Sequence, residues 1–460
     1  MNTNDHPASG GPGTRREFLK KASTLAAAAA TANLFKTPVY GQSQAPSTGR
    51  VIGANDRIAV GIIGVGFGIG QNHLQGIVKE AGSNNVVVAA AADLFNKRRD
   101  WAKQNASLKD EDVYSEYKKM LDRKDIDAVL IATHEPWHCK ITLDALDAGK
   151  HVYCEKPMTR YLGEAFQVYD AVKRTGRVYQ VGSQGCSAEG WHKCGELIQA
   201  GKIGELIWAQ GYYCRNSVGG EWNYPIETES TAANIDWETW LGPVKKRVAF
   251  SAEHFHRWRK YFPYSTGPLS DLAPHRLHPL MLATGKPEFP VRVSCFGTTI
   301  VHPDRAVAGT PEREVPEHIQ ITAEFPSGFM ISLTCSTVNA KSPGFVIYTH
   351  KATLNVGTSG ERVELVPEKE WSEDIDPATM TGLQPEDMRV HEKNWFDSIR
   401  NGKAPNGDID LAIRVQTVIS LAEMSQRLNI TCQFDEKSKK ITNGDGKEIA
   451  AITYGTLPSS

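Results

Sequence analysis

The sequence lacks a surplus of either charge, because 52 lysines and arginines are balanced by 53 aspartates and glutamates in 460 residues. Such a balance provides no basic field for nucleic acid or for an anionic membrane surface. The sequence also lacks an apolar run of the roughly 18 residues that a membrane span needs. We therefore expect no nucleic-acid partner and no membrane span. The hydrophobic share of 40% is typical of an ordinary globular protein.

Cysteine pairs of the CxxC type are also missing, and no internal repeat is present. In a chain of this length, eight scattered cysteines do not form the framework of a disulfide-rich domain. We expect most of them to be small buried side chains, with one or two disulfides as the alternative. These are Cys139, Cys154, Cys186, Cys194, Cys214, Cys295, Cys335 and Cys432.

The first forty residues differ from the rest of the chain. The run TRREFLK at 14–20 precedes an alanine-rich stretch from Ala22 to Leu34. Paired arginines followed by a weakly apolar segment are typical of an export signal, and this one resembles the twin-arginine consensus. We expect a signal peptide over 1–41, a polar leader over 42–55 and a periplasmic or otherwise exported protein that uses the twin-arginine machinery. A basic tail without this role is the alternative.

Short apolar segments alternate with helix-like segments between residues 58 and 181. Such alternation predicts βαβ units and a doubly wound parallel sheet, which we place in a Rossmann domain at 56–182. The expected strands lie at 58–63, 86–92, 128–132, 151–154 and 178–181. The expected helices lie at 71–80, 101–105, 114–121, 140–149 and 164–174.

After residue 182 the pattern changes to half-exposed strands. It predicts a second α/β domain over 183–435 with an open, mostly antiparallel sheet, followed by a C-terminal tail over 436–460. A stretch at 219–263, rich in Trp, His, Gly and Pro, predicts a functional loop. The expected strands lie at 206–213, 291–298, 318–325, 329–336, 345–350 and 352–356, and the helices at 193–201 and 408–427.

A glycine run follows the first strand and opens a helix. Glycines at this junction let the backbone approach a pyrophosphate at the helix N-terminus. The spacing departs from GxGxxG, because the last glycine is Gly70 and Gly68 is extra. Asp93 ends the next strand, 23 residues after Gly70, and favours NAD over NADP. Lys97 and Arg98 keep NADP as an alternative, although we interpret them as a solvated helix start. The predicted cofactor contacts here are Gly64, Gly66, Phe67, Gly68, Gly70 and Asp93.

The run AGKHVYCEKP at 148–157 resembles the most specific signature of the Gfo/Idh/MocA oxidoreductases, which include glucose–fructose oxidoreductase and inositol dehydrogenase. The resemblance implies that Lys156 lies beside the nicotinamide and shares the proton of a substrate hydroxyl. It also implies that Glu155 contributes to the cofactor site. The segment from Thr133 to His138 is similar to the family's loop near the nicotinamide, which adds these two residues to the cofactor contacts.

Asp271 and His275 are four residues apart, a spacing that predicts one face of a helical turn. A carboxylate and an imidazole in one cavity suit a general base and its partner. The run DLAPH resembles the family's DxGxH motif, so we assign Lys156, Asp271 and His275 as catalytic. The departures are Ala273-Pro274, and His278 where relatives often carry Asp. The predicted substrate contacts are Trp258, Arg259, Tyr264 and His278.

The surrounding aromatic and histidine residues admit other interpretations. Trp222, Tyr224 and Tyr261 suit stacking on sugar faces, but ordinary packing is the alternative for each. His254 and His256, together with His275 and His278, lie within 25 residues. A metal site is the alternative there, but HxH and HxxH are weak spacings, and we predict no metal.

The resemblance extends from Arg57 to about Phe434. It implies hydride transfer between a sugar or polyol hydroxyl and NAD, or NADP, held tightly because an exported enzyme has no soluble cofactor pool. It also implies a homo-oligomer formed through the C-terminal sheet. The alternative is a glycoside-cleaving enzyme that oxidises the sugar transiently with bound NAD. A non-catalytic scaffold is the third hypothesis, against which Lys156, Asp271 and His275 argue.

Overall fold

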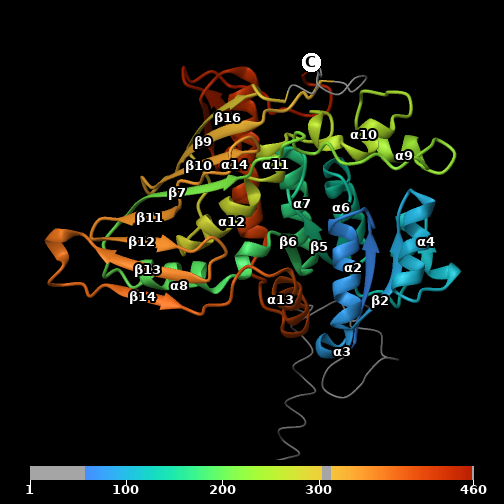
Figure 1. Cartoon of the computed structure of the whole chain (residues 1–460), viewed down its shortest axis with the longest axis horizontal. Coiled ribbons are helices and arrows are strands. Elements are labelled where there is room, and N and C mark those ends of the chain that lie inside the picture. Colours follow the sequence, from blue (N-terminus) through green and yellow to red (C-terminus); the bar gives the residue numbers. More distant parts are fainter. Residues whose placement is uncertain (1–56, 303–311, 458–460) are drawn as a thin grey trace, which may run out of the picture. The chain divides into compact units, whose positions relative to one another are not determined.

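The computed structural model describes residues 57–302 and 312–457, all of which belong to one structural unit, Pro46–Ser460 (Figure 1). The expected signal peptide and polar leader lie outside the described residues. Among the helices that are described, none has both the length and the apolar character of a membrane span. The eight cysteines are unpaired, and all are buried except Cys214, which is half-buried.

The first sheet confirms the predicted Rossmann fold. Six parallel strands follow the order β3-β2-β1-β4-β5-β6, the arrangement of dinucleotide-binding domains. Strands β1 and β4 are buried along their whole length, which explains their continuous apolar sequence. The strands are β1 (Ile58–Ile63), β2 (Val86–Ala92), β3 (Val113–Tyr114), β4 (Ala128–Ile131), β5 (His151–Glu155) and β6 (Tyr179–Gly182).

The helices of this part differ from prediction in two places. Helix α4 begins at Asn96, five residues before the expected start, and the segment expected as one helix over 114–121 contains the end of β3 and then α5. The helices are α2 (Ile69–Lys79), α3 (Ala81–Asn84), α4 (Asn96–Asn105), α5 (Tyr117–Leu121), α6 (His138–Asp147) and α7 (Leu162–Thr175).

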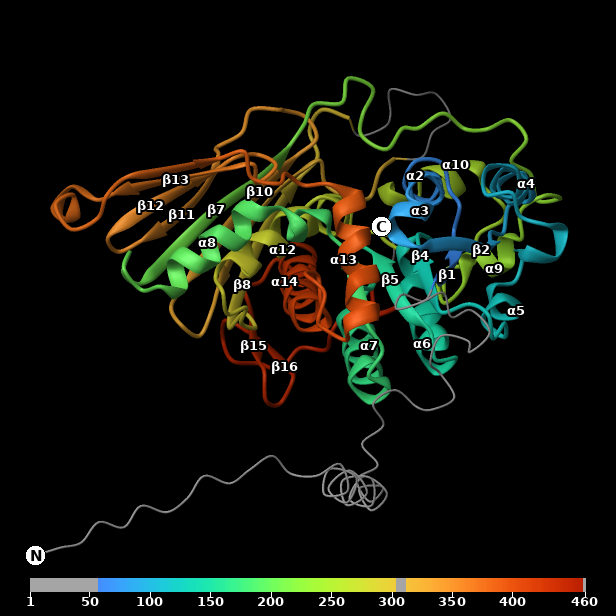
Figure 2. The ribbon, with the colours of Figure 1, turned by 90° about the horizontal axis from the view of Figure 1, so that it is seen from below.

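One helix of the first part comes from the far end of the chain. Helix α13 (Met388–Asn401) places Trp395 and Phe396 in the same hydrophobic cluster as Ile62 of β1 and Leu74 of α2. In Figure 2, α13 lies between the two sheets. Helix α13, which belongs to the segment expected as the second domain, therefore packs on the Rossmann part, and the domain boundaries stay a prediction.

The second sheet is open and mostly antiparallel, as predicted. Its order is β14-β13-β12-β11-β7-β10-β9-β8-β15-β16, and β7 with β10 is its parallel pair. Because β16 pairs with β15, the domain continues past residue 435, and the expected tail is partly sheet. The strands are β7 (Leu206–Cys214), β8 (Arg292–Thr298), β9 (His318–Glu324), β10 (Met330–Ser336), β11 (Phe345–Thr349), β12 (Ala352–Val356), β13 (Arg362–Pro367), β14 (Ala378–Thr381), β15 (Cys432–Asp435) and β16 (Lys440–Asn443).

Helices α8 (Glu189–Gln199), α12 (Pro274–Ala283) and α14 (Ile409–Leu428) cover one face of this sheet (Figures 1 and 2). On the other face, the rings of Trp208 and Tyr348 stack at 4.1 Å between centroids. Oligomerisation through this sheet stays a prediction.

The expected functional loop is a strap, residues 219–263, which leads from the second sheet back to the first. It contains α9 (Trp237–Leu241) and α10 (Ala252–His256), and α11 (Pro268–Asp271) follows it. Ile235 of the strap forms a β-bridge with Phe95. The strap therefore lies against the carboxyl end of β2, where a Rossmann cofactor binds. Short 3-10 helices complete the described fold: η1 (Asp110–Asp112), η2 (Glu135–Trp137), η3 (Gln184–Ser187), η4 (Trp258–Lys260) and η5 (Lys369–Trp371).

Candidate active site

A cavity of about 820 Å³ extends from the glycine run to Asp271. Its size is that of an organic-ligand site. The first sheet contributes the run's residues, Asp93 and Thr133, and the strap contributes Tyr224, Trp258 and Arg259. The cavity therefore joins the predicted cofactor residues to one predicted catalytic residue.

The glycine run is shaped by close backbone contacts. Gly64 has φ +89°, and a Cβ there would lie 2.7 Å from the carbonyl oxygen of Ala132. A Cβ on Gly70 would collide with the carbonyl oxygen of Gly64. No side chain caps the first turn of α2, although the Gln71 N–H donates to the Gly66 carbonyl at 3.2 Å. The helix N-terminus can therefore still offer backbone N–H groups to an anion. Gly64, Gly66, Phe67 and Gly68 line the cavity, whereas Gly70 supports the turn from behind.

Asp93 is anchored to the glycine run by its own carboxylate. Its Oδ2 accepts a hydrogen bond of 2.7 Å from the Val65 N–H, and its Oδ1 accepts one of 2.9 Å from the Phe95 N–H. Each carboxylate oxygen accepts a second bond, so Asp93 can still receive two ribose hydroxyls. The cradle and this carboxylate fit a nicotinamide dinucleotide.

The cations beyond Asp93 are paired with the strap. Lys97 Nζ lies 2.9 Å from Glu227 Oε2, and Arg98 lies 3.6 Å from Glu227 Oε1. The Arg98 guanidinium also lies over the rings of Phe95 and Phe255. The interpretation of Arg98 as a solvated residue is therefore wrong, since its side chain is only 14% exposed.

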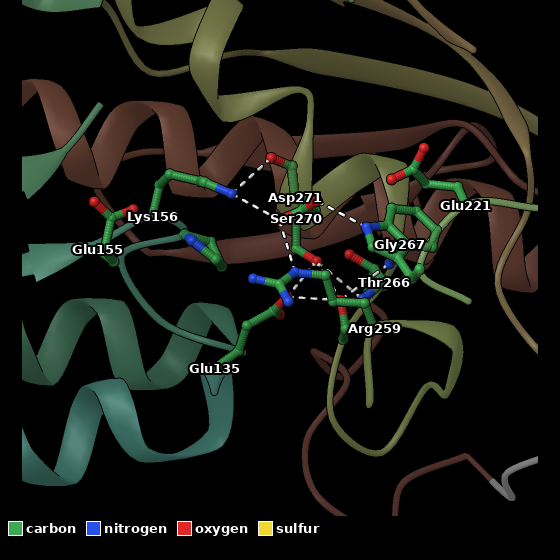
Figure 3. Close-up of polar contacts among 12 residues, drawn as sticks. Glu135, Glu155, Lys156, Glu221, Arg259, Thr266, Gly267, Ser270 and Asp271 are labelled. Carbon is green, nitrogen blue, oxygen red and sulfur yellow. Dashed lines mark hydrogen bonds and ion pairs between the residues drawn. The ribbon is translucent and has the colours of Figure 1, made fainter. Parts of the chain in front are cut away.

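Asp271 lines the other end of the cavity, and Lys156 contacts it there from behind the lining; Figure 3 shows this contact. Lys156 follows β5, and its Nζ donates to Asp271 Oδ1 at 2.7 Å and to the Asp271 carbonyl at 2.9 Å. Arg259 Nε donates to the same Oδ1 at 2.9 Å, and Trp222 Nε1 donates to Oδ2 at 3.0 Å. Burial would raise the pKa of Asp271, but Lys156 and Arg259 outweigh burial and hold it well below its usual range. Asp271 is thus an anion that positions Lys156.

His275 lies beyond a break in the helix. Asp271 is the last residue of α11, and α12 begins at Pro274, so the prediction of one continuous helical turn is wrong. Proline suits the first position of a helix, which explains why α12 starts there. Burial, with the charges of Lys156 and Arg276, lowers the pKa of His275 well below its usual value. His275 is therefore neutral and able to accept a proton, although it does not line the cavity.

Two predicted cofactor residues lie behind the cavity. His138 is buried, and its ring nitrogens contact the carbonyls of Pro157 at 2.7 Å and Thr133 at 3.1 Å. It therefore holds the loop after β4 against the segment after Lys156. Glu155 is buried too, and it contacts His73 and Gln184.

The predicted substrate contacts divide into two groups. Trp258 and Arg259 line the cavity. Tyr264 is buried, with its hydroxyl 3.0 Å from His254 Nδ1. His278 is buried in α12, with its Nδ1 2.8 Å from the Pro274 carbonyl. The structure thus does not bring Tyr264 and His278 to the cavity.

Arg215 is the site residue that sequence reasoning missed. It follows β7 and lines the cavity, with its NH2 2.8 Å from Glu221 and 3.9 Å from Asp271. Its signal in the sequence is weak, because a charged residue after a strand is common. Throughout residues 57–302 and 312–457, no group of three or more His, Cys, Asp or Glu side chains is arranged to hold a metal ion.

Two family models match the chain and together cover more than half of it. The model described as "Oxidoreductase family, NAD-binding Rossmann fold" matches residues 58–183. The model described as "GFO/IDH/MocA C-terminal domain" matches residues 241–355. The first match includes the glycine run and Lys156, and the second includes Asp271 and His275.

Curated relatives are similar to parts of the chain. Inositol 2-dehydrogenase of Salmonella typhimurium is 27% identical over 186 residues, which are 40% of this chain and 54% of the relative. Alpha-N-acetylgalactosaminidase of Shewanella oneidensis is 28% identical over 254 residues, which are 50% of this chain and 54% of the relative. The chain thus spans about half the length of the curated relatives it matches.

Solved structures resemble the fold more completely. A levoglucosan dehydrogenase in complex with NADH aligns with a TM-score of 0.65 over 82% of this chain and 98% of that one, at 19% identity. A structure titled oxidoreductase domain protein from Kribbella flavida aligns with a TM-score of 0.65 over 83% and 100%, at 18% identity. At these identities the likeness shows the fold alone.

Proposed function

Because the chain belongs to the Gfo/Idh/MocA oxidoreductase family, we propose that it transfers hydride between a sugar or polyol hydroxyl and tightly bound NAD. One observation supports this proposal most directly: Asp271, which lines the far end of the cavity that begins at the glycine run, holds Lys156 by a hydrogen bond of 2.7 Å. The similarity to inositol 2-dehydrogenase, over 40% of this chain, supports the substrate class.

At the reacting hydroxyl, different residues of the chain can donate a hydrogen bond, accept the proton and position the donor. Of the three N–H donors of Lys156, two contact Asp271, and the third is available to the hydroxyl oxygen. His275 is neutral and can accept the hydroxyl proton. The Asp271 carboxylate is already bonded to Lys156, Arg259 and Trp222, so we assign it the positioning of Lys156. The glycine run and Asp93 would hold a nicotinamide dinucleotide, which would supply the hydride acceptor for this chemistry.

The test uses Lys156→Ala and His275→Ala. We expect each variant to lower turnover by a factor of roughly 10²–10⁴, since each removes a positioned proton-transfer group. The double variant should lose less than the product of the two losses, because both groups serve one proton transfer. Turnover is measured as cofactor reduction with a panel of sugars and polyols.

Lys140→Ala is the matched control, because Lys140 pairs with Asp144 on the surface of α6. Cofactor content should be the same in all variants. Full activity of Lys156→Ala or of His275→Ala would refute the assigned roles.

Glycoside cleavage through transient sugar oxidation is the second candidate. The similarity to alpha-N-acetylgalactosaminidase over half of this chain favours it. It also suits an exported enzyme, because it needs no net redox partner. Incubation with aryl glycosides and polysaccharide fragments, followed by mass spectrometry, separates the two candidates. Aglycone release without net cofactor reduction selects cleavage.

A further inference from the structure

The catalytic end of the cavity, taken together with the charged side chains that contact its lining, has more positive than negative groups. Lys156, Arg215 and Arg259 are the cations, and Asp271 and Glu221 are the carboxylates that contact them. Lys156 and Arg259 both pair with Asp271, whereas Arg215 pairs with Glu221. Positive charge that is withdrawn from water requires a partner of opposite sign.

Neighbouring groups do not remove this surplus. Burial raises the pKa of Glu135 to about 7, and its Oε1 accepts hydrogen bonds from the hydroxyls of Ser265 and Ser270. Glu135 therefore carries only part of a charge at neutral pH. His134, which lines the cavity, is neutral because burial lowers its pKa to about 3.

Arg259 has unused donors that face the cavity. Its Nε is bonded to Asp271, but its two terminal nitrogens have no hydrogen-bond partner in the described part of the chain. The guanidinium lies 4.1 Å from the centroid of the Trp258 ring, which holds its plane in one orientation. Figure 3 shows it next to Asp271 and Ser270. A planar fork of this kind matches the oxygens of a carboxylate or of a sulfate or phosphate ester.

Arg215 supports the same conclusion from the other side of Asp271. Its Nε is buried and has no partner among residues 57–302 and 312–457. Its NH2 lies 3.9 Å from Asp271 Oδ2, so Arg215 and Arg259 flank one carboxylate. Tyr224 and Trp258 line the cavity beside them and provide the faces on which a sugar ring can stack.

We propose that the substrate is an acidic sugar, with a carboxylate, sulfate or phosphate group that the terminal nitrogens of Arg259 bind and that Arg215 helps to neutralise. This inference rests on the proposed function for the identity of the ligand as a sugar. Beyond the proposed function, the inference specifies that the substrate is negatively charged and that Arg259 and Arg215 recognise this charge. Lys156 stays at the reacting hydroxyl, so the anionic group lies at a second position on the ring.

Matched sugar pairs test the proposal on the purified protein with its own cofactor. The pairs are D-glucuronate with D-glucose, D-galacturonate with D-galactose, and glucose 6-sulfate and glucose 6-phosphate with D-glucose. Affinity is measured by calorimetry, and turnover by cofactor reduction. We expect at least one acidic sugar to bind about 10- to 100-fold more tightly than its neutral counterpart, the usual effect of a charge-assisted bond. The acid that does so identifies the anionic group.

Three variants assign the preference to Arg259. Arg259→Gln should abolish it, and Arg259→Lys should keep part of it, because charge remains while the fork is lost. Arg247→Gln is the matched control, since Arg247 is exposed in the same strap and donates to the Gly242 carbonyl, away from the cavity lining. Cofactor content and circular dichroism report whether each variant is folded.

The outcomes separate this inference from the proposed function. Equal or weaker binding of every acidic sugar, or an unchanged preference in Arg259→Gln, would overturn the inference. Turnover of neutral sugars without any preference would leave the oxidoreductase function intact. Tight binding of an acidic sugar without hydride transfer or aglycone release from any substrate would overturn the function and keep the inference.

Discussion

His73 sits in a buried ion cluster that connects three elements around the site. Its Nε2 lies 2.9 Å from Glu155 and its Nδ1 lies 2.6 Å from Glu392, whose other oxygen contacts Arg389 at 2.6 Å. Burial alone would lower the pKa of His73, but the two carboxylates outweigh burial and raise it to about 9. The protonated ring thus joins α2, β5 and α13 immediately behind Lys156.

This cluster predicts a pH-dependent contribution to stability. A pKa raised from 6.5 to about 9 in the folded state means that the contribution is complete below pH 6.5 and is lost as pH rises through 9. We expect His73→Gln to lower the free energy of unfolding by ~3 kcal/mol at pH 6.5, and by much less at pH 9.5. Denaturant titrations at the two pH values measure the difference.

His350→Gln provides the comparison, because His350 is exposed. It should change stability little at either pH. A loss in His73→Gln that is the same at pH 6.5 and pH 9.5 would mean that the ring is neutral in the folded protein.

At the scale of residues, a functional residue can be predicted from the sequence when it belongs to a short local motif. Lys156 and Asp271 were identifiable because each lies in a short, specific run. The partnership of His73 with Glu392 spans 319 residues of sequence, and no local pattern encodes it. Arg215 was missed for the same reason, since only the fold brings it to Asp271.

At the scale of elements, the buried parallel strands were the most predictable, because a strand covered on both faces is a continuous apolar run. Strands β13 and β14 were not predicted because they carry charged or exposed residues, and β14 is the edge strand of the sheet. Helix α13 was not predicted, and its apolar face packs on the Rossmann part, which is far from it in the sequence. The break between α11 and α12 follows from Pro274, a departure from the DxGxH motif that the sequence already shows.

Contacts of the strap lead to a prediction about the preference of the protein for NAD over NADP. Glu227 lines the cavity and forms ion pairs with Lys97 and Arg98. Both cations are therefore already neutralised and do not bind the 2′-phosphate of NADP. We expect Glu227→Gln to raise the ratio of NADP to NAD affinity roughly 10-fold, because about one charged pair is released. Asp93→Ala should shift the ratio in the same direction by weakening NAD. Exchange of bound cofactor against isotopically labelled NAD and NADP gives the ratio.

Glu229→Gln is the matched control for this strap. Glu229 also pairs with Lys97, at 3.1 Å, but it neither contacts Arg98 nor lines the cavity. A shift in Glu229→Gln as large as that in Glu227→Gln would indicate a general loss of negative charge instead of a specific contact.

At the scale of the whole molecule, two features bear on when the cofactor binds. They are the paired arginines at 15 and 16 and the cofactor cavity. We propose that the protein folds around its cofactor in the cytoplasm and is then exported in the folded state. Twin-arginine export accepts folded proteins, and an exported enzyme has no cofactor pool to draw on. The glycine run, Asp93 and the strap all line the cavity, so a bound cofactor would contact all three, which favours slow cofactor release.

The proposal makes a joint prediction for the exported protein and for a retained precursor. The protein purified from outside the cytoplasm should release NAD on denaturation, as chromatography detects, without any having been added. Replacement of Arg15 and Arg16 by Lys should stop export, and the precursor that accumulates inside should already contain the same amount of NAD per chain. An exported protein that lacks cofactor and does not bind added NAD would refute tight binding. Normal export of the double variant would refute the twin-arginine route, and an empty precursor would place cofactor loading after export, where no pool exists to supply it.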